Sequence, residues 1–573
     1  MPVRLRSSVT INGLRHSRRA APLSGRAGLA SLAAFKVPEI NNEPNKHYAP
    51  GSLDRQGLTN ALNSFKQRLP LDVPAVVAGK HITQNVQTQP NPSSHTDAVA
   101  RWSSASAADV NTAVDAALSA KCDWEAMPFS DRAAIFLKAA DLISDKYRYD
   151  IMTATMLGQG KNAWQAEIDS AAESCDFLRF NVKYAQELYN TQPVHNSPGV
   201  WNRVEYRPLE GFVYAISPFN FTAIAANLPS APALMGNVVV WKPSPAAMAS
   251  NWLVYQILLE AGLPKDVIQF VPGDAEEVTR VALGRKEFSA LHYTGSTAVF
   301  RSLFSKIAAN VADGTYVGYP RVVGETGGKN FHLLHETADA KTAALQTVRG
   351  AFEYQGQKCS ACSRAYVPSS LFKDFSTVLV SATQSLKIGG PEHFDNFIGP
   401  VIHRASFDKL KNVIDEAKSD PELELLAGGT YDDSKGFFIA PTVYKTSNPH
   451  HKLMSTELFG PVLVVYEYDA SFAEVCKTID ATTSYALTGA VFARDRAAVR
   501  FAEDALRDSA GNFYINTKCT GAVVGQQPFG GARMSGTNDK AGSQNLLSRF
   551  VSARAVKEEF TGIEGVEYPS NAV

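Results

Sequence analysis

The sequence predicts an α/β protein with a doubly wound parallel sheet, a second α/β domain and a small β arm. Strand and helix patterns alternate from residue 212 to residue 293, the order expected of parallel strands joined by crossover helices. A second α/β stretch runs from about residue 325 to residue 516. The chain of 573 residues also exceeds what one hydrophobic core usually holds. We therefore expect several domains.

The first 36 residues differ in composition from the rest of the chain. Six arginines precede the first acidic residue, Glu39, and serine and alanine fill much of the sequence between them. This composition is typical of a mitochondrial transit peptide. A basic tail that binds an anionic partner is the alternative. We assign residues 1–36 to a transit peptide and expect the mature protein in the mitochondrial matrix.

Helices and a turn-rich segment precede the predicted sheet. Apolar residues three and four positions apart predict helices through residues 104–190. Residues 191–207 are rich in turn formers and then alternate in polarity, which predicts a hairpin arm. Residues 548–557 predict a strand that can pair elsewhere. Exposed strand edges need partners, so we expect a homodimer or a higher homo-oligomer.

The central alternation predicts individual elements. Helices are expected at 221–235, 248–261 and 275–283, and strands at 212–216, 237–241, 267–271 and 290–293. In an open parallel sheet, ligands bind beyond the carboxyl ends of the strands. The segments that follow these strands are therefore the candidate binding site.

Composition excludes several classes of function. Lysine plus arginine equals aspartate plus glutamate, 56 each, so the basic footprint of a nucleic-acid binder is absent. The apolar run 221–241 contains prolines and asparagines, which argues against a membrane span. The six cysteines form no disulfide framework. Cys359 and Cys362 lack a second ligand pair at zinc spacing, so we expect no metal.

The turn around Cys359 is the most informative segment. The sequence Gly356-Gln-Lys-Cys-Ser360 lies between a predicted helix at 341–354 and a predicted strand at 364–368. A glycine-containing turn lets the backbone approach a substrate, and we expect Lys358 to favour the thiolate, which is the nucleophilic form. Most cysteines are small core residues, so this turn alone does not decide whether Cys359 is a catalytic nucleophile or a core residue.

Four further polar residues follow predicted strands. Asn220 either points its amide into the crevice or caps a helix. Lys242 either binds ribose hydroxyls or is simply solvated. Ser296, after Gly295, can cap a helix and donate to a phosphate. Glu325 lies beside flexible glycines, which suits a base that must move.

Taken together and in this order, these segments resemble the aldehyde dehydrogenase superfamily over roughly residues 60–560. The landmarks at 457–461 and 529–531 agree. Within that superfamily, residues 352–364 and 521–538 are similar to the branch that oxidises L-glutamate γ-semialdehyde in the second step of proline breakdown in mitochondria. The same chemistry on another acid aldehyde, such as succinate semialdehyde, and a catalytically silent binding protein are the alternatives.

The resemblance implies an aldehyde dehydrogenase-like fold with a Rossmann-type sheet, and NAD as the cofactor. It implies an NAD-binding domain at 37–190 and 208–324, a catalytic domain at 325–520, and an oligomerisation arm and C-terminal segment at 191–207 and 521–573. The implied catalytic residues are Cys359 as nucleophile, Glu325 as general base and Asn220 as oxyanion donor. The implied cofactor contacts are Ser217, Lys242, Gly295, Ser296, Glu457 and Phe459. The implied substrate contacts are Lys358, Ser360, Gly521, Ala522, Phe221 and Phe529.

Overall fold

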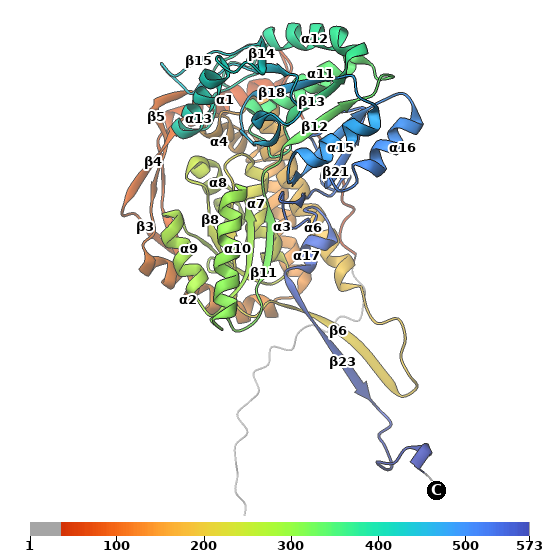
Figure 1. The fold of residues 1–573 in the computed structure, drawn as a ribbon. Coiled ribbons are helices and arrows are strands. Elements are labelled where there is room, and N and C mark those ends of the chain that lie inside the picture. Colours follow the sequence, from red (N-terminus) through yellow and green to blue (C-terminus); the bar gives the residue numbers. More distant parts are fainter. Residues whose placement is uncertain (1–35, 572–573) are drawn as a thin grey trace, which may run out of the picture. The chain divides into compact units, whose positions relative to one another are not determined.

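The computed structural model describes residues 36–571 (Figure 1). Residues 1–35 of the predicted transit peptide lie outside the described residues. From Val37 onward the chain forms one compact unit. Among the described residues, no helix combines the length and the apolarity that crossing a membrane requires.

The first sheet has seven strands in the order β11-β10-β7-β8-β9-β2-β3. Its strands are β7 (Phe212–Ile216), β8 (Val238–Lys242), β9 (Ile268–Phe270), β10 (Phe288–Thr294), β11 (Arg321–Glu325), β2 (Ala75–Val77) and β3 (Lys80–Ile82). The first five are parallel, and β2 and β3 are antiparallel additions. The chain winds outward from β7 in one direction and returns to its other side at β10, which confirms the doubly wound prediction.

Three of the helices between these strands follow the predicted ranges closely: α7 (Thr222–Leu234), α8 (Met248–Ala261) and α9 (Ala275–Gly284). The fourth, α10 (Thr297–Ala312), has no predicted range. Helix α8 ends at Gly262, which adopts the left-handed conformation favoured at a helix end. Helix α7 contains Pro229 and Pro232, yet its residues are almost all buried. Burial therefore outweighs the loss of two backbone donors.

A helical layer precedes this sheet, as the sequence predicts. It contains α1 (Leu53–Gln67), α2 (Ala107–Ala126), α3 (Phe129–Ser144), α4 (Arg148–Gln159), α5 (Ala163–Ala166), a π-helical turn η1 (Glu167–Ala172) and α6 (Glu173–Tyr189). The strands β1 (Leu71–Val73), β4 (Val86–Asn91) and β5 (Ser94–Ser103) form a separate small sheet before α2.

The second large sheet also has seven strands, in the order β14-β17-β18-β13-β12-β20-β21. Its strands are β12 (Asn330–Leu334), β13 (Cys362–Pro368), β14 (Leu423–Ala427), β17 (Thr442–Thr446), β18 (Val462–Tyr468), β20 (Thr488–Phe492) and β21 (Asn512–Ile515). All are parallel except the edge strand β14. Its helices are α11 (Ala340–Phe352), α12 (Ser369–Gln384), α13 (Arg404–Ala417), α15 (Phe472–Thr482) and α16 (Arg496–Ala505). Glu325 ends β11 of the first sheet, and the division into domains stays a prediction.

The remaining elements are short. They are α14 (Lys452–Ser455), α17 (Gln544–Ser548), β15 (Tyr431–Asp432), β16 (Phe438–Ile439), β19 (Tyr485–Ala486), β22 (Ala532–Arg533), and the 3-10 turns η2 (Pro245–Ala247), η3 (Glu353–Gly356) and η4 (Pro569–Asn571).

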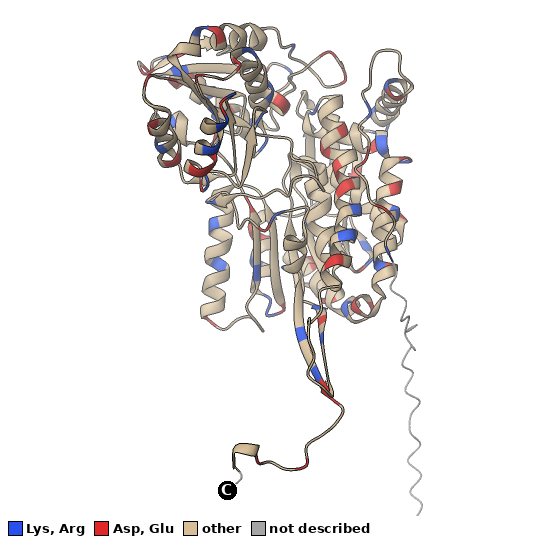
Figure 2. Cartoon of the chain, turned by 90° about the vertical axis from the view of Figure 1, so that its right-hand side faces the viewer, with Lys and Arg blue, Asp and Glu red and all other residues tan. Residues whose placement is uncertain are grey.

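The arm is a two-stranded antiparallel ribbon of β6 (Val200–Pro208) and β23 (Val551–Glu559). The predicted local hairpin at 191–207 is therefore wrong: this segment contributes one strand, and its partner is the predicted tail strand. Ion pairs cross the ribbon from Arg203 to Glu558 and from Arg554 to Glu205. In Figure 1 the ribbon extends beyond the body of the unit, and Figure 2 shows charges of both signs along it.

Candidate active site

Cys359 lies in the turn between α11 and β13, and an unusual backbone shapes this turn. Tyr354, Gln355 and Gly356 have φ angles of 51°, 55° and 65°. A side chain at Gly356 would place its Cβ 2.3 Å from the carbonyl oxygen of Gly460. Glycine is therefore required there, both for its positive φ and for the close approach of the two backbones.

Two asparagine side chains fix the backbone around Cys359. Asn330 donates from Nδ2 to the carbonyl oxygens of Cys359 at 2.7 Å and Ala361 at 2.9 Å. From the other side, the buried Asn220 donates from Nδ2 to the carbonyl oxygen of Gln357 at 3.1 Å. The amide of Asn220 thus lies beside the turn that carries the thiol. Its role as an oxyanion donor stays a prediction.

Glu325 lies at the carboxyl end of β11 and is held by the loop that follows β21. Its Oε2 accepts a hydrogen bond from the backbone N–H of Gly531 at 2.8 Å. Burial raises the pKa of Glu325 well above its usual value, although the Gly531 N–H and Lys540 act in the opposite direction. Burial therefore acts against the charged form of this carboxyl group.

The Cys359 thiol is also held in its neutral form. Burial and the nearby charges of Glu457 and Glu325 raise its pKa to about 12, against the opposing effect of backbone N–H groups. The expectation that Lys358 favours the thiolate is wrong in this structure. The Nζ atom of Lys358 lies 3.5 Å from Oε2 of Glu353, and its charge is directed to that carboxylate.

A chain of buried charges lies behind the thiol, and no sequence pattern predicts it. Glu353 Oε2 lies 2.7 Å from Nζ of Lys518 and also pairs with Lys358. Lys358 lies 4.0 Å from Asp169, which forms a close ion pair with the buried Lys161. These residues come from distant parts of the sequence, and no local motif identifies them.

Glu173 lies in the first turn of α6, four residues after Asp169. Burial is the main cause that raises the pKa of Glu173 to about 8, and the charge of Asp169 adds to it. At neutral pH this side chain is therefore largely protonated.

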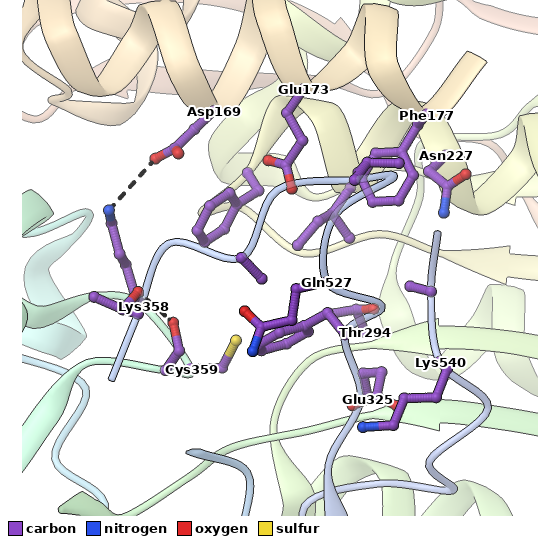
Figure 3. Close-up of a pocket in the computed structure, with 18 of the residues that line it drawn as sticks. Asp169, Glu173, Phe177, Asn227, Thr294, Glu325, Lys358, Cys359, Gln527 and Lys540 are labelled. Atoms are coloured by element: carbon purple, nitrogen blue, oxygen red, sulfur yellow. Dashed lines mark hydrogen bonds and ion pairs between the residues drawn. The ribbon is translucent and has the colours of Figure 1, made fainter. Parts of the chain in front are cut away.

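One cavity collects these groups. Figure 3 shows Lys358 and Asp169 on one side, Glu325 and Lys540 on the other, and the sulfur of Cys359 between them. The six residues predicted to contact the substrate all line the cavity: Lys358, Ser360, Gly521, Ala522, Phe221 and Phe529. The hydroxyl groups of Ser360 and Thr520 are hydrogen-bonded at 2.6 Å. The predicted nucleophile and base therefore share a cavity with every predicted substrate contact.

Four of the predicted cofactor residues lie at the carboxyl edge of the first sheet. Ser217 follows β7 and its Oγ accepts from the indole N–H of Trp241 at 2.9 Å. Ser296 is exposed after Gly295 and caps α10, with Oγ accepting from the backbone N–H of Val299. Both positions follow the neighbouring strands β7 and β10, where the chain reverses its winding direction.

Lys242 ends β8 and is the most unusual of the predicted cofactor residues. It is only 5% exposed, and among the described residues no carboxylate lies within 4.0 Å of its ammonium group. Burial lowers its pKa to about 8. A buried amine without an ion-pair partner suits a ligand that supplies hydroxyl or anionic oxygens.

The other two predicted cofactor residues lie apart from this edge. Glu457 and Phe459 line a smaller cavity on the far side of Lys358. The Oε1 atom of Glu457 accepts from the backbone N–H of Gly328 at 2.9 Å, and Phe459 has a φ of 56°. Their contact with a cofactor stays a prediction.

The expectation of no metal is not tested. The described residues include a buried group of His332, Cys362 and Cys519 whose ligand atoms lie within 4.8 Å of one another. The Nε2 atom of His332 already accepts a hydrogen bond from the backbone N–H of Cys519 at 3.1 Å.

Comparison with known proteins agrees with this geometry. Residues 81–556 match the aldehyde dehydrogenase family. The chain is 65% identical over 558 residues to the mitochondrial delta-1-pyrroline-5-carboxylate dehydrogenase of Emericella nidulans, covering 96% of this chain and 97% of that protein. It is 47% identical over 548 residues to the human protein of that name, covering 95% and 96%.

Solved structures give the same result. The delta-pyrroline-5-carboxylate dehydrogenase of Mycobacterium tuberculosis bound with NAD superposes with a TM-score of 0.91 at 46% identity, covering 95% of this chain and 100% of that one. The predicted fold class is therefore confirmed. This chain belongs to the aldehyde dehydrogenase family.

Proposed function

We propose that this enzyme oxidises L-glutamate γ-semialdehyde, formed by opening of 1-pyrroline-5-carboxylate, to L-glutamate with NAD. The observation that carries the proposal is the cavity itself. Cys359 and Glu325 line it together with all six predicted substrate contacts. The relatives matched over nearly the whole chain carry the name of this activity.

The first half of the reaction uses Cys359 and Asn220. The sulfur attacks the aldehyde carbon as the thiolate, which forms by loss of the thiol proton to solvent, and the carbonyl oxygen becomes an oxyanion. Asn220, which now donates to the Gln357 carbonyl, and the backbone N–H of Cys359 would hold that oxyanion. One donor of this kind contributes about 3 kcal/mol to the transition state. Burial raises the pKa of this thiol to about 12, so only a small fraction is thiolate near neutral pH.

The second half uses Glu325. Loss of hydride from the tetrahedral intermediate leaves a thioester on Cys359. A water molecule then attacks the thioester carbon, Glu325 takes a proton from that water, and the sulfur leaves as thiolate. The raised pKa of Glu325 makes it a stronger base once it is deprotonated. The product is a carboxylate, and a second turnover can begin.

The edge of the first sheet fits NAD. When bound, NAD supplies the acceptor for the hydride. Lys242 offers a buried ammonium without an ion-pair partner, and Ser296 offers an exposed hydroxyl at the N-terminus of α10, where the helix favours phosphate. Ser217 stands between them after β7. Gly295 precedes Ser296 at this edge, whereas the other two proposed contacts, Glu457 and Phe459, lie apart from it, between α14 and β18.

The opposite wall fits the amino-acid end of the substrate. The Gly521–Ala522 backbone and the Ser360 hydroxyl face the cavity without a bulky side chain, and Lys358 adds a cation nearby. Phe221 and Phe529 supply apolar surface for the aliphatic middle. A carboxylate held by backbone N–H groups would leave the aldehyde free to reach Cys359.

The decisive experiment measures NADH formation by the full chain. The protein is given NAD and 1-pyrroline-5-carboxylate, succinate semialdehyde or propanal in parallel, and Cys359→Ala is the control. We expect the highest kcat/KM with 1-pyrroline-5-carboxylate and no turnover by the variant. A preference for succinate semialdehyde would overturn the proposed substrate. Turnover by Cys359→Ala equal to that of the wild type would overturn the proposed role of Cys359 as nucleophile.

We also propose a mitochondrial matrix location and a homo-oligomeric assembly. The relatives from Emericella nidulans and human are named mitochondrial, and residues 1–36 have the composition of a transit peptide. The ribbon of β6 and β23 leaves backbone edges unpaired within the described chain. Light scattering should report a dimer or larger, and a monomer at micromolar concentration would contradict this assembly.

A further inference from the structure

Residues 37–50, here called the strap, form neither helix nor strand but are tightly held against the helical layer. Glu43 forms an ion pair with the buried Arg148 of α4. Tyr48 donates from its hydroxyl to Oε2 of Glu167 in the π-helical turn at 2.6 Å. The strap is therefore a fixed part of the fold.

One strap residue, Asn42, connects two other parts of the chain. Its Nδ2 donates to Oδ2 of Asp176 at 2.8 Å and to the carbonyl oxygen of Val524 at 2.7 Å. Its Oδ1 accepts from Nε2 of Gln526 at 2.9 Å. The amide thus uses both of its N–H donors and its oxygen. It links Asp176 to the segment of Val524 and Gln526, which lies far from Asp176 in the sequence.

Two of the three partners of Asn42 belong to segments that line the substrate cavity. Asp176 lies on α6 between Glu173 and Phe177, which both line the cavity. Val524 also lines the cavity and lies two residues after Ala522, in a loop that forms no helix or strand over residues 521–528. A loop without ladder hydrogen bonds depends on side chains such as Asn42 for its position.

Apolar packing supports the same connection. Phe177, Phe180 and Val524 form a small buried cluster with Ala223, and Ile40 of the strap packs against it. Ile40 and Asn42 lie two residues apart in the extended strap. The strap therefore contacts the junction between α6 and the loop through both an apolar and a polar side chain.

We propose that the strap positions the substrate-binding loop and that Asn42 is the positioning residue through which it acts. By holding Val524 against Asp176, Asn42 fixes where the Gly521–Ala522 backbone faces the cavity. This inference rests on the proposed function, because that backbone is taken to bind the α-carboxylate of the substrate. Asn42 itself does not line the cavity, so it affects catalysis only through the loop.

The kinetic test uses Asn42→Ala, with the exposed neighbour Asn41→Ala as the matched control. We expect Asn42→Ala to raise KM for 1-pyrroline-5-carboxylate about tenfold, the equivalent of about 1.4 kcal/mol of hydrogen bonding. The KM for NAD and the kcat/KM for propanal, which has no α-carboxylate, should stay unchanged. An equal loss with both aldehydes would mean a general structural defect and would overturn the proposal.

Gln526→Ala provides a second variant that removes the bond to Oδ1 from the loop side. Gln526 is exposed, so this change should leave folding intact. We expect a smaller rise in KM in the same direction, and less than additive effects when it is combined with Asn42→Ala. Fully additive effects on KM in the double variant would contradict a shared contact. An unchanged KM in both single variants would contradict it as well.

Hydrogen–deuterium exchange separates this inference from the proposed function. Asn42→Ala should speed exchange in peptides that span residues 521–531, and Asn41→Ala should not. If the wild-type protein oxidises only other aldehydes, the proposed function fails while the exchange comparison still decides whether the strap holds the loop. Unchanged exchange in this loop for Asn42→Ala would overturn the strap proposal, even if 1-pyrroline-5-carboxylate proves to be the substrate.

Discussion

Glu353 is expected to stabilise the fold by compensating two buried ammonium groups. It is 3% exposed, and its Oε2 lies 2.7 Å from Lys518 and 3.5 Å from Lys358. Burial acts against its ionisation, but the charges of Lys358 and Lys518 prevail and lower its pKa from 4.5 to about 2. A difference of this size favours the charged form in the fold by about 3 kcal/mol.

The perturbation is Glu353→Gln, which keeps the shape and removes the charge. The two lysines respond differently to their pairing with Glu353. The pKa of Lys358 is raised, whereas burial lowers the pKa of Lys518 despite the pairing. The burial cost of Lys518 therefore offsets part of the attraction, and about 3 kcal/mol is an upper limit for the loss. Because the folded pKa of Glu353 is depressed, its contribution is fully present above about pH 4.5 and is lost as pH falls toward 2.

The assay compares thermal unfolding and the rate of heat inactivation near neutral pH. Asp395→Asn removes an exposed ion pair with Lys387 and is the matched control, with an expected loss of stability much smaller than that of Glu353→Gln because solvent screens the pair. Adding Lys518→Met to Glu353→Gln should recover part of the stability, because one uncompensated cation is removed. A Glu353→Gln protein as stable as the wild type would refute the reasoning.

Three further predictions concern the reacting groups. The rate of Cys359 alkylation by iodoacetamide should rise about tenfold per pH unit through the neutral range, because burial raises the pKa of the thiol to about 12; a plateau near neutrality would show a thiolate already formed. Glu325→Gln should slow thioester hydrolysis about 100-fold or more while a rapid first turnover of NADH persists, and loss of that burst would place Glu325 earlier in the reaction. Lys242→Met should raise KM for NAD about tenfold without lowering thermal stability, since it removes a buried ammonium; an unchanged KM would exclude Lys242 from the cofactor site.

The sequence was sufficient for the elements whose burial pattern is local. The buried strand Val238–Lys242 and the helix Met248–Ala261 are apolar runs that end at turn residues, so their boundaries could be predicted to within about two residues. The strand Val86–Asn91 is largely exposed and polar, so it lacks an apolar run from which a strand could be predicted. The pairing of β6 with β23 joins segments more than three hundred residues apart, which no local pattern encodes.

The same distinction applies to the site. Cys359 and Glu325 lie in short glycine-containing segments after regular elements, and such segments stand out in a sequence. Lys518 and Asp169 are isolated polar residues, and their relation to Lys358 exists only after three segments fold together. The expectation that Lys358 activates Cys359 failed for this reason, because the nearest charge in sequence was already neutralised by partners distant in sequence.

This neutralisation places most of the substrate recognition on the loop. Lys358 shares its charge with Glu353 and Asp169, and Lys518 shares its charge with Glu353. Under the proposed function, neither cation is free to bind an α-carboxylate at full strength. Backbone N–H groups at Gly521–Ala522 carry no such competing partner charge, so their position sets the affinity. A side chain that fixes this loop, as Asn42 does, therefore controls binding more directly than its distance from the thiol suggests.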